Sequence, residues 1–279
     1  MKTLRFASYF HGLTNPNQKI DWEKITITNN FMFCTIMQNP EICKEFLETM
    51  LKIKIDHLDY VHGEDTISED ILEKGIRLDV HVKDSDREFD LEVQLVNTYE
   101  LPLRARFYQS LLDAYALDKG LPYNKLKENY VLFICPFDLF DKSLPVYTFE
   151  KICLEDSEIK LGDKTKTIFY NFSEWRKVHD EEIKIMLKYF DGEKAESSLT
   201  NKIDKEVTRN RIKRQWREEY MTYEQDMAVR QQYWYKDGVA AGAAQLKAKD
   251  DLIIQEKDEA LNEKDAEIAR LKAQLAEKA

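Results

Sequence analysis

The stretch GIRLDVHVKDSDREFDLEVQL, from Gly75 to Leu95, has the most regular pattern in this 279-residue sequence. Apolar and polar residues alternate strictly on both sides of the polar segment DSDR. A period of two residues is typical of strands, so the stretch predicts an antiparallel hairpin. If the turn is symmetric, Val80 lies opposite Leu91. The same register places Asp79 opposite Glu92.

This register puts the Asp79 and Glu92 carboxylates on one face of the hairpin, with their Cβ atoms roughly 5 Å apart. Like charges at that separation repel, and a divalent cation between them would remove the penalty. Mg²⁺, with Mn²⁺ as a substitute, fits because it prefers oxygen ligands and takes few protein carboxylates. The Val93 carbonyl would be a further ligand, and Gln94 would orient a water molecule. Polar residues that alternate along a strand are more often simply its solvent-exposed face, and the pattern alone leaves that alternative open.

Length and composition indicate one large α/β domain with an appendage, because 43% of the residues are hydrophobic and Gly and Pro are scarce. No apolar run approaches the ~20 residues that span a bilayer, and the N-terminus lacks the apolar core of a signal peptide. The four cysteines are widely spaced without a CxxC pair, which favours buried free thiols in a cytoplasmic protein. The net charge of −10 argues against non-specific nucleic-acid binding by the chain as a whole, unless its basic residues cluster.

Other segments predict the elements around the hairpin. Asn29 or Asn30 is expected to cap a first helix, and Asn39 precedes Pro40 at the start of a second. The expected later elements are a strand over His57–His62, the hairpin, a helix over Pro102–Gly120, a buried strand over Asn129–Cys135, and two peripheral strands over Val146–Cys153 and Thr165–Phe172. In the long helix, Leu103, Phe107 and Leu111 are expected to face the sheet. This order predicts an α/β sandwich with a mixed central sheet.

The C-terminal third is predicted to be helical and charged. The block Lys202–Arg217 carries seven basic residues and is interpreted either as a phosphate-binding stripe or as a solvated helix face. Its candidate phosphate contacts are Arg209, Arg211, Lys213 and Arg214. In the tail Lys247–Ala279 a one-sided heptad leaves two alternatives open, a weak coiled coil that forms a homo-oligomer and a solvated helix. We therefore expect three parts, residues 1–200 as the main domain, 201–245 as a basic helical extension and 246–279 as a charged tail.

Most catalytic signatures are missing from the sequence. It contains no GxGxxG, P-loop, GxSxG or HExxH motif, and its five histidines are scattered. The set that remains is Asp79, Glu92 and Gln94. Hydrolysis of a phosphodiester needs a cation that neutralises charge on the phosphate and lowers the pKa of the attacking water, and paired carboxylates meet that need.

Asp79, followed by Glu92-Val93-Gln94, resembles the D…ExQ variant of the PD-(D/E)XK nuclease superfamily. More specifically, the chain resembles the bacterial PD-(D/E)XK nuclease family transposases, which are related to the Rpn recombination-promoting nucleases. The segments that carry the resemblance are Thr28–Phe33, Gly75–Val80, Arg106–Ser110, Gly120–Tyr123 and Tyr130–Asp138. It covers roughly Ile25 to Phe172.

The resemblance implies a restriction-endonuclease-like α-β-β-β-α-β core and metal-dependent DNA cleavage. It makes Asp79 and Glu92 metal ligands and puts Gln94 in the place of the superfamily's lysine. Asn30 stands where many relatives carry an acidic residue. From the helix after the hairpin, Arg106 and Tyr108 would contact phosphate; core packing or surface solvation is the alternative for these two residues.

The sequence therefore predicts a cytoplasmic, Mg²⁺-dependent DNA endonuclease associated with mobile elements or recombination, with DNA as its partner and no membrane. A different class stays open, a nuclease-fold protein that binds DNA or oligomerises with little or no turnover. A third reading is a structural adaptor dominated by its coiled-coil tail.

Overall fold

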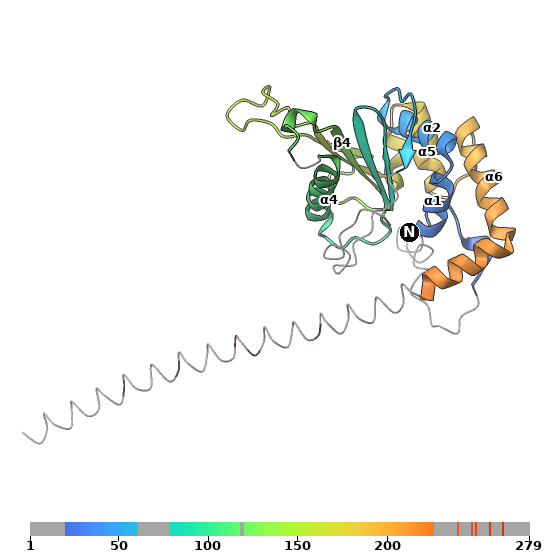
Figure 1. Ribbon diagram of the computed structural model, residues 1–279. Helices are drawn as coiled ribbons and strands as arrows, with labels where there is room; N and C mark the ends of the chain where they lie inside the picture. The colour runs from blue at the N-terminus through green and yellow to red at the C-terminus, as the bar shows by residue number, and fades with distance from the viewer. Residues whose placement is uncertain are drawn as a thin grey trace, which may run out of the picture. The chain divides into compact units, whose positions relative to one another are not determined.

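The structure is a computed structural model that describes residues 20–60, 79–117 and 120–225, with a few isolated positions beyond (Figure 1). The chain divides into two compact units, residues 1–218 and 219–279. In the second unit, residues 219–225 are helical. No helix in the described ranges is long and apolar enough to cross a membrane.

A mixed six-stranded sheet forms the centre of the first unit, in the order β1-β2-β3-β4-β6-β5. The strands are β1 (Asp59–Tyr60), β2 (Val80–Lys83), β3 (Arg87–Val93), β4 (Glu128–Cys135), β5 (Val146–Phe149) and β6 (Thr165–Asn171). β4 is parallel to both β3 and β6, and the other pairings are antiparallel. Val80 pairs with Leu91, which confirms the register predicted from a symmetric turn. The prediction that Thr165–Phe172 is peripheral is wrong, because β6 lies between β4 and β5.

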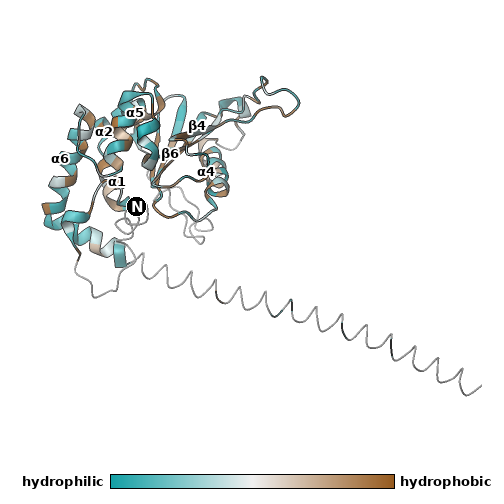
Figure 2. Cartoon of the chain, turned by 180° about the vertical axis from the view of Figure 1, so that it is seen from behind, coloured by the Kyte–Doolittle hydropathy of each residue, from teal (hydrophilic) through white to brown (hydrophobic). Residues whose placement is uncertain are grey.

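Helices cover both faces of this sheet. They are α1 (Asn30–Met37), α2 (Pro40–Leu51), α4 (Leu101–Ala116), α5 (Glu181–Phe190) and α6 (Ser198–Ile212), with short 3₁₀ helices η2 (Trp22–Lys24), η3 (Tyr123–Lys125) and η4 (Phe172–Lys177). α4 lies on one face, and α1, α2 and α5 lie on the other (Figures 1 and 2). The predicted α/β fold with the α-β-β-β-α-β core is therefore confirmed.

The first two helices begin where capping side chains satisfy their free amides. The Asn29 side chain accepts a hydrogen bond from the Met32 amide, so Asn29 is the cap of α1 and leaves Asn30 for another role. Asn39 caps α2 in the same way, and Pro40 occupies the first turn, where no amide hydrogen is needed.

α4 packs on β4 and β6 through an apolar cluster. Its members are Leu101, Ala105, Tyr108, Leu111, Leu112, Val131, Phe133, Cys135, Tyr147 and Phe169. Of the three residues predicted to face the sheet, Leu111 belongs to this cluster and Phe107 packs against it, but the prediction for Leu103 is wrong, because Leu103 is 59% exposed. The helix also ends at Ala116, before the predicted cap at Gly120, because Leu117 is extended.

α6 packs against α1, α2 and α5. It ends at Ile212, and Lys213 has an extended backbone before a further helical stretch begins at residue 214. The basic block Lys202–Arg217 is therefore not one continuous helix face, because the backbone changes direction at Lys213.

Cys43 and Cys135 are buried free thiols, as predicted, whereas the free thiols of Cys34 and Cys153 are partly exposed. Burial raises the pKa of Cys43 to about 12, so this thiol stays protonated and unreactive near neutral pH.

Candidate active site

β3 presents a row of polar side chains to the face that α4 covers. Asp90 is fully buried and Glu92 is only 2% exposed. The Arg104 guanidinium of α4 reaches Glu92 Oε2 at 3.2 Å, which fixes the side of the sheet on which the row lies. The interpretation of these alternating polar residues as a solvent-exposed face is therefore wrong. Burying carboxylates costs free energy, so the row needs a compensating role.

Asp79 stands directly before β2, beside Glu92. Its backbone amide donates to Glu92 Oε1 at 3.1 Å, so the two residues are neighbours, as the register predicts. The Val93 amide donates to Asp79 Oδ2 at 3.4 Å, and Asn30 Nδ2 donates to the same oxygen. The contact that Val93 makes with Asp79 is thus through its amide rather than the carbonyl predicted as a metal ligand.

Arg104 connects this carboxylate pair with α4. It donates to Gln94 Oε1 at 2.8 Å and to the Tyr108 hydroxyl at 2.7 Å, in addition to its ion pair with Glu92. Its guanidinium also lies 5.8 Å from the centre of the Phe133 ring. At its other end, the Gln94 amide donates to the Val96 carbonyl at 2.8 Å. Both ends of the Gln94 side chain are therefore held by protein groups.

The electrostatics of the row favour protonated carboxyls in the absence of a cation. Burial raises the pKa of Asp90 and of Glu92 well above the usual carboxyl range, and the negative charge of Asp79 raises both further. Arg104 opposes this shift in both cases. Both carboxylate oxygens of Asp90 are buried without a hydrogen-bond partner in the described part of the chain. This is an environment that positive charge would stabilise.

The neighbouring carboxylates of Asp79 and Glu92 are the candidate ligands of a cation. Within residues 20–60, 79–117 and 120–225, no group of three or more His, Cys, Asp or Glu side chains is arranged to bind a metal ion. Mg²⁺ commonly binds through one or two protein carboxylates and keeps several waters, so a pair is a sufficient ligand set. The residues fit a hard divalent cation.

The structure brings only one of the two helix residues predicted at the site, Tyr108, to the carboxylates. Tyr108 is buried beside Arg104, but Arg106 is exposed. Residues two apart on a helix point about 200° away from each other, so Arg106 and Tyr108 cannot face the same site. Arg104, rather than Arg106, lies at the site. It precedes Tyr108 by four residues, and residues at this spacing share one face of a helix, so the sequence contained the signal that identifies Arg104. Asp90 was missed too, although it continues the alternation through Glu92.

The basic residues of the predicted phosphate stripe have protein partners. Arg211 Nε donates to the Ile25 carbonyl at 2.7 Å and so anchors α6 to the segment before α1. The other three contact neighbours in their own segment, at 3.5 Å for Arg209–Glu206, 3.0 Å for Lys213–Asn210 and 2.8 Å for Arg214–Glu218. These contacts agree better with solvated helix faces than with a dedicated phosphate-binding site.

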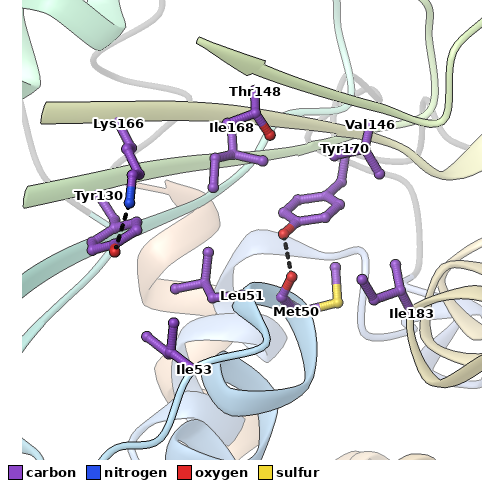
Figure 3. Close-up of a pocket in the computed structure, with 10 residues that line it drawn as sticks. All are labelled: Met50, Leu51, Ile53, Tyr130, Val146, Thr148, Lys166, Ile168, Tyr170 and Ile183. Atoms are coloured by element: carbon purple, nitrogen blue, oxygen red, sulfur yellow. Dashed lines mark hydrogen bonds between the residues drawn. The ribbon is translucent and has the colours of Figure 1, made fainter. Parts of the chain in front are cut away.

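A separate pocket of about 330 Å³ lies between the end of α2, α5 and the sheet (Figure 3). Its lining is mainly apolar, and the Tyr170 hydroxyl donates to the Met50 carbonyl at 2.5 Å across it. Lys166, the one charged lining residue, pairs with Glu128 at 2.7 Å. None of the residues of the carboxylate site lines this pocket.

The strand order and the paired carboxylates at β2 and β3 define a PD-(D/E)XK nuclease-like fold. A family model described as "PD-(D/E)XK nuclease family transposase" matches residues 30–234, well over half of the chain. The chain belongs to this family, as its sequence motifs predict. No curated protein and no solved structure gave a significant match to it.

Proposed function

We propose that this protein is a metal-dependent DNA endonuclease, associated with mobile elements or recombination, that uses Asp79 and Glu92 to hold Mg²⁺ or Mn²⁺. The observation that carries the proposal is the pair of adjacent carboxylates beside the fully buried Asp90. A bound divalent cation would neutralise charge on the phosphate and lower the pKa of the attacking water. The family supplies the substrate class, because its description names a nuclease and a transposase.

Arg104 would provide the fixed positive charge of the site. The superfamily's usual lysine is replaced by the neutral Gln94, but the Arg104 guanidinium lies 2.8 Å from the Gln94 side-chain oxygen. A guanidinium keeps its charge at any physiological pH and binds phosphate through two parallel hydrogen bonds. Arg104 would thus orient Glu92 in the free protein and stabilise negative charge on the phosphate during cleavage.

Asn30 and Tyr108 would hold these groups in place. Asn30 donates to Asp79 Oδ2 and would thereby hold the Asp79 carboxylate in position beside Glu92. Burial raises the pKa of Tyr108, so its hydroxyl stays protonated and can both accept from Arg104 and donate to a phosphate oxygen.

The test is incubation of the pure full-length protein with plasmid and Mg²⁺ or Mn²⁺, beside the Asp79→Ala variant. Nicking or linearisation by the wild type that disappears with Asp79→Ala is expected. Cleavage that persists in the variant would contradict the assignment of the site.

A second candidate is a nuclease-fold protein with weak or no turnover that binds DNA. It is favoured by the Gln94 side chain, whose oxygen and nitrogen are both engaged by protein groups and which therefore has less capacity to orient a water molecule. No cleavage by wild type with either cation, together with DNA binding, would favour this candidate.

An exchange of charge tests the role of Arg104. Gln94→Lys alone would place two cations side by side and lower cleavage, whereas adding Arg104→Gln would restore a single positive charge and part of the activity. If Gln94→Lys alone increases cleavage, Arg104 does not replace the lysine.

A further inference from the structure

Tyr99 is a highly exposed aromatic residue in the loop that joins β3 to α4. Its residue is 84% exposed, and its backbone has a left-handed φ of 59°. This conformation is uncommon for any residue with a side chain and disfavoured for a bulky one. The Asn97 side chain holds it by accepting a hydrogen bond from the Tyr99 amide at 2.8 Å. The fold thus keeps a large ring in solvent at a cost to the backbone.

Hydrogen bonds connect both ends of this loop to residues of the candidate active site. At its start, the Gln94 side chain donates to the Val96 carbonyl at 2.8 Å. At its end, the Glu100 carbonyl accepts from the Arg104 amide at 2.9 Å, and the Arg104 side chain returns to Gln94. Tyr99 stands midway in sequence between Gln94 and Arg104, so it lies on a short loop whose two ends are connected to residues of the candidate site.

Other exposed side chains lie on this loop and on the first turns of α4. Val96 is 42% exposed on the loop, and Leu103 is 59% exposed on the outer face of α4. Arg106, one turn after Leu103, is exposed on the same face. Exposed aromatic rings are the side chains on which unpaired bases stack, and cations on the same surface attract the phosphates of a single strand.

We infer that Tyr99 stacks on an unpaired base next to the phosphodiester at Asp79 and Glu92, so that the substrate is DNA with a single-stranded segment. The inference rests on the proposed nuclease function. In a paired duplex, neighbouring base pairs cover the faces of each base, so an exposed ring finds a partner only where a base is unstacked. Because every base has a face that can stack, this contact selects strand structure rather than sequence.

Binding to a labelled single-stranded oligonucleotide and to a blunt duplex of the same sequence tests the inference. It is measured by fluorescence anisotropy with full-length protein in chelator, where metal-dependent cleavage is suppressed. Tyr99→Ala should weaken single-strand binding about five- to a hundredfold and duplex binding by less than about twofold. Tyr99→Phe should keep most of the affinity, since it keeps the ring.

The chain offers a matched control in Tyr123. This tyrosine is 82% exposed on η3, just before β4. Since β3 and β4 are parallel, Tyr123 lies at the end of the sheet opposite to Gln94. Tyr123→Ala should therefore leave both affinities unchanged. Tyr99→Asn serves as a second variant, because Asn tolerates the left-handed backbone and lacks the ring, and it should weaken single-strand binding as Tyr99→Ala does.

The outcomes separate this inference from the proposed function. Suppose that the wild type cleaves DNA and that Tyr99→Ala binds and cleaves single-stranded DNA like Tyr123→Ala. The inference is then overturned and the nuclease function stands. In that case the exposed ring serves a protein partner. If wild type cleaves nothing but single-strand binding depends on the Tyr99 ring, the nuclease function fails and the stacking contact stands.

Discussion

The two faces of β3 are both buried, yet they differ completely in chemistry. One carries Phe89, Leu91 and Val93, which pack with the apolar core. The other carries Asp90 and Glu92 under α4, with burial and the charge of Asp79 raising the pKa of both carboxyls. The apolar face accounts for stability through burial of apolar surface. The polar face costs stability, and this asymmetry is the reason for proposing it as the functional face.

The largest effect is expected from Glu92→Gln, which keeps the shape of the side chain and removes its charge. If Glu92 holds the cation, cleavage should fall by about 10²–10³-fold or more, the scale on which loss of one preorganised electrostatic group acts. The thermal stability of the metal-free protein should change little, because the removal of a buried ionisable group is offset by the loss of the ion pair with Arg104. The measurement is plasmid cleavage together with thermal denaturation.

Glu88→Gln is the matched control for this variant. Glu88 is buried on the same face of β3, four residues from Glu92, and lies 3.2 Å from His81. An equal loss of cleavage in both variants would mean that charge anywhere along this face matters, and the assignment of Glu92 as the residue that holds the cation would fail.

Leu91→Ala should show the opposite division of effects. Leu91 is fully buried on the apolar face, so its truncation should lower the free energy of unfolding by about 2–5 kcal/mol. Cleavage per folded molecule should be nearly unchanged. Urea denaturation measures the first quantity, and Leu103→Ala, at a position that is 59% exposed, should change it by less than about 0.5 kcal/mol. If Leu91→Ala lost cleavage without losing stability, the distinction between the apolar and the polar face of β3 would be contradicted.

The pH dependence of stability tests the polar face without cleavage. A carboxyl whose pKa is raised by folding binds its proton more tightly in the folded than in the unfolded protein. The free energy of unfolding of the metal-free protein should therefore fall as pH rises from the ordinary carboxyl range towards the raised pKa of Asp90, by at most about 1.4 kcal/mol per pH unit and group.

Asp90→Asn should reduce this slope and stabilise the protein at neutral pH, as followed by urea denaturation in chelator. Asp86→Asn, at an exposed position in the turn of the same hairpin, is the control and should leave the slope unchanged. A slope that is the same in wild type and Asp90→Asn would show that Asp90 is charged in both states.

The smallest effects are expected on α6 and the segment after it. Arg209 and Arg214 are exposed and paired with acidic neighbours, so Arg209→Ala and Arg214→Ala should change stability by less than about 0.5 kcal/mol. If they do contact phosphate, each variant should reduce the salt dependence of DNA binding by about one counterion, as a salt titration of the affinity would reveal. An unchanged salt slope would leave the basic block as a solvated surface.

The parts of the fold that depend on local pattern could be predicted from the sequence. The alternation around the DSDR turn determined the pairing of Val80 with Leu91, because one slip in register would move every side chain to the wrong face. Asn39 and Pro40 determined where α2 begins, since capping involves only neighbouring residues.

Parts that depend on long-range packing could not be predicted in this way. The sequence offers two stripes on α4, and only docking on β4 and β6 determines that Tyr108 and Leu111 are buried whereas Leu103 is exposed. The same docking buries Asp90 and brings Arg104 to Glu92. The polar face of β3 is therefore a buried row of carboxyls rather than a solvent-exposed surface. No Gly or Pro near Lys213 indicates in the sequence that the backbone changes direction there.

The most direct test of the central claim is a crystal of the full-length protein soaked in Mn²⁺ and measured for anomalous scattering. We predict a peak between the Asp79 and Glu92 carboxylates in wild type, lost in a Glu92→Gln crystal soaked in the same way. A peak elsewhere in the molecule, with the space between Asp79 and Glu92 empty at saturating Mn²⁺, would contradict the assignment of the polar face of β3 as a metal-dependent nuclease site.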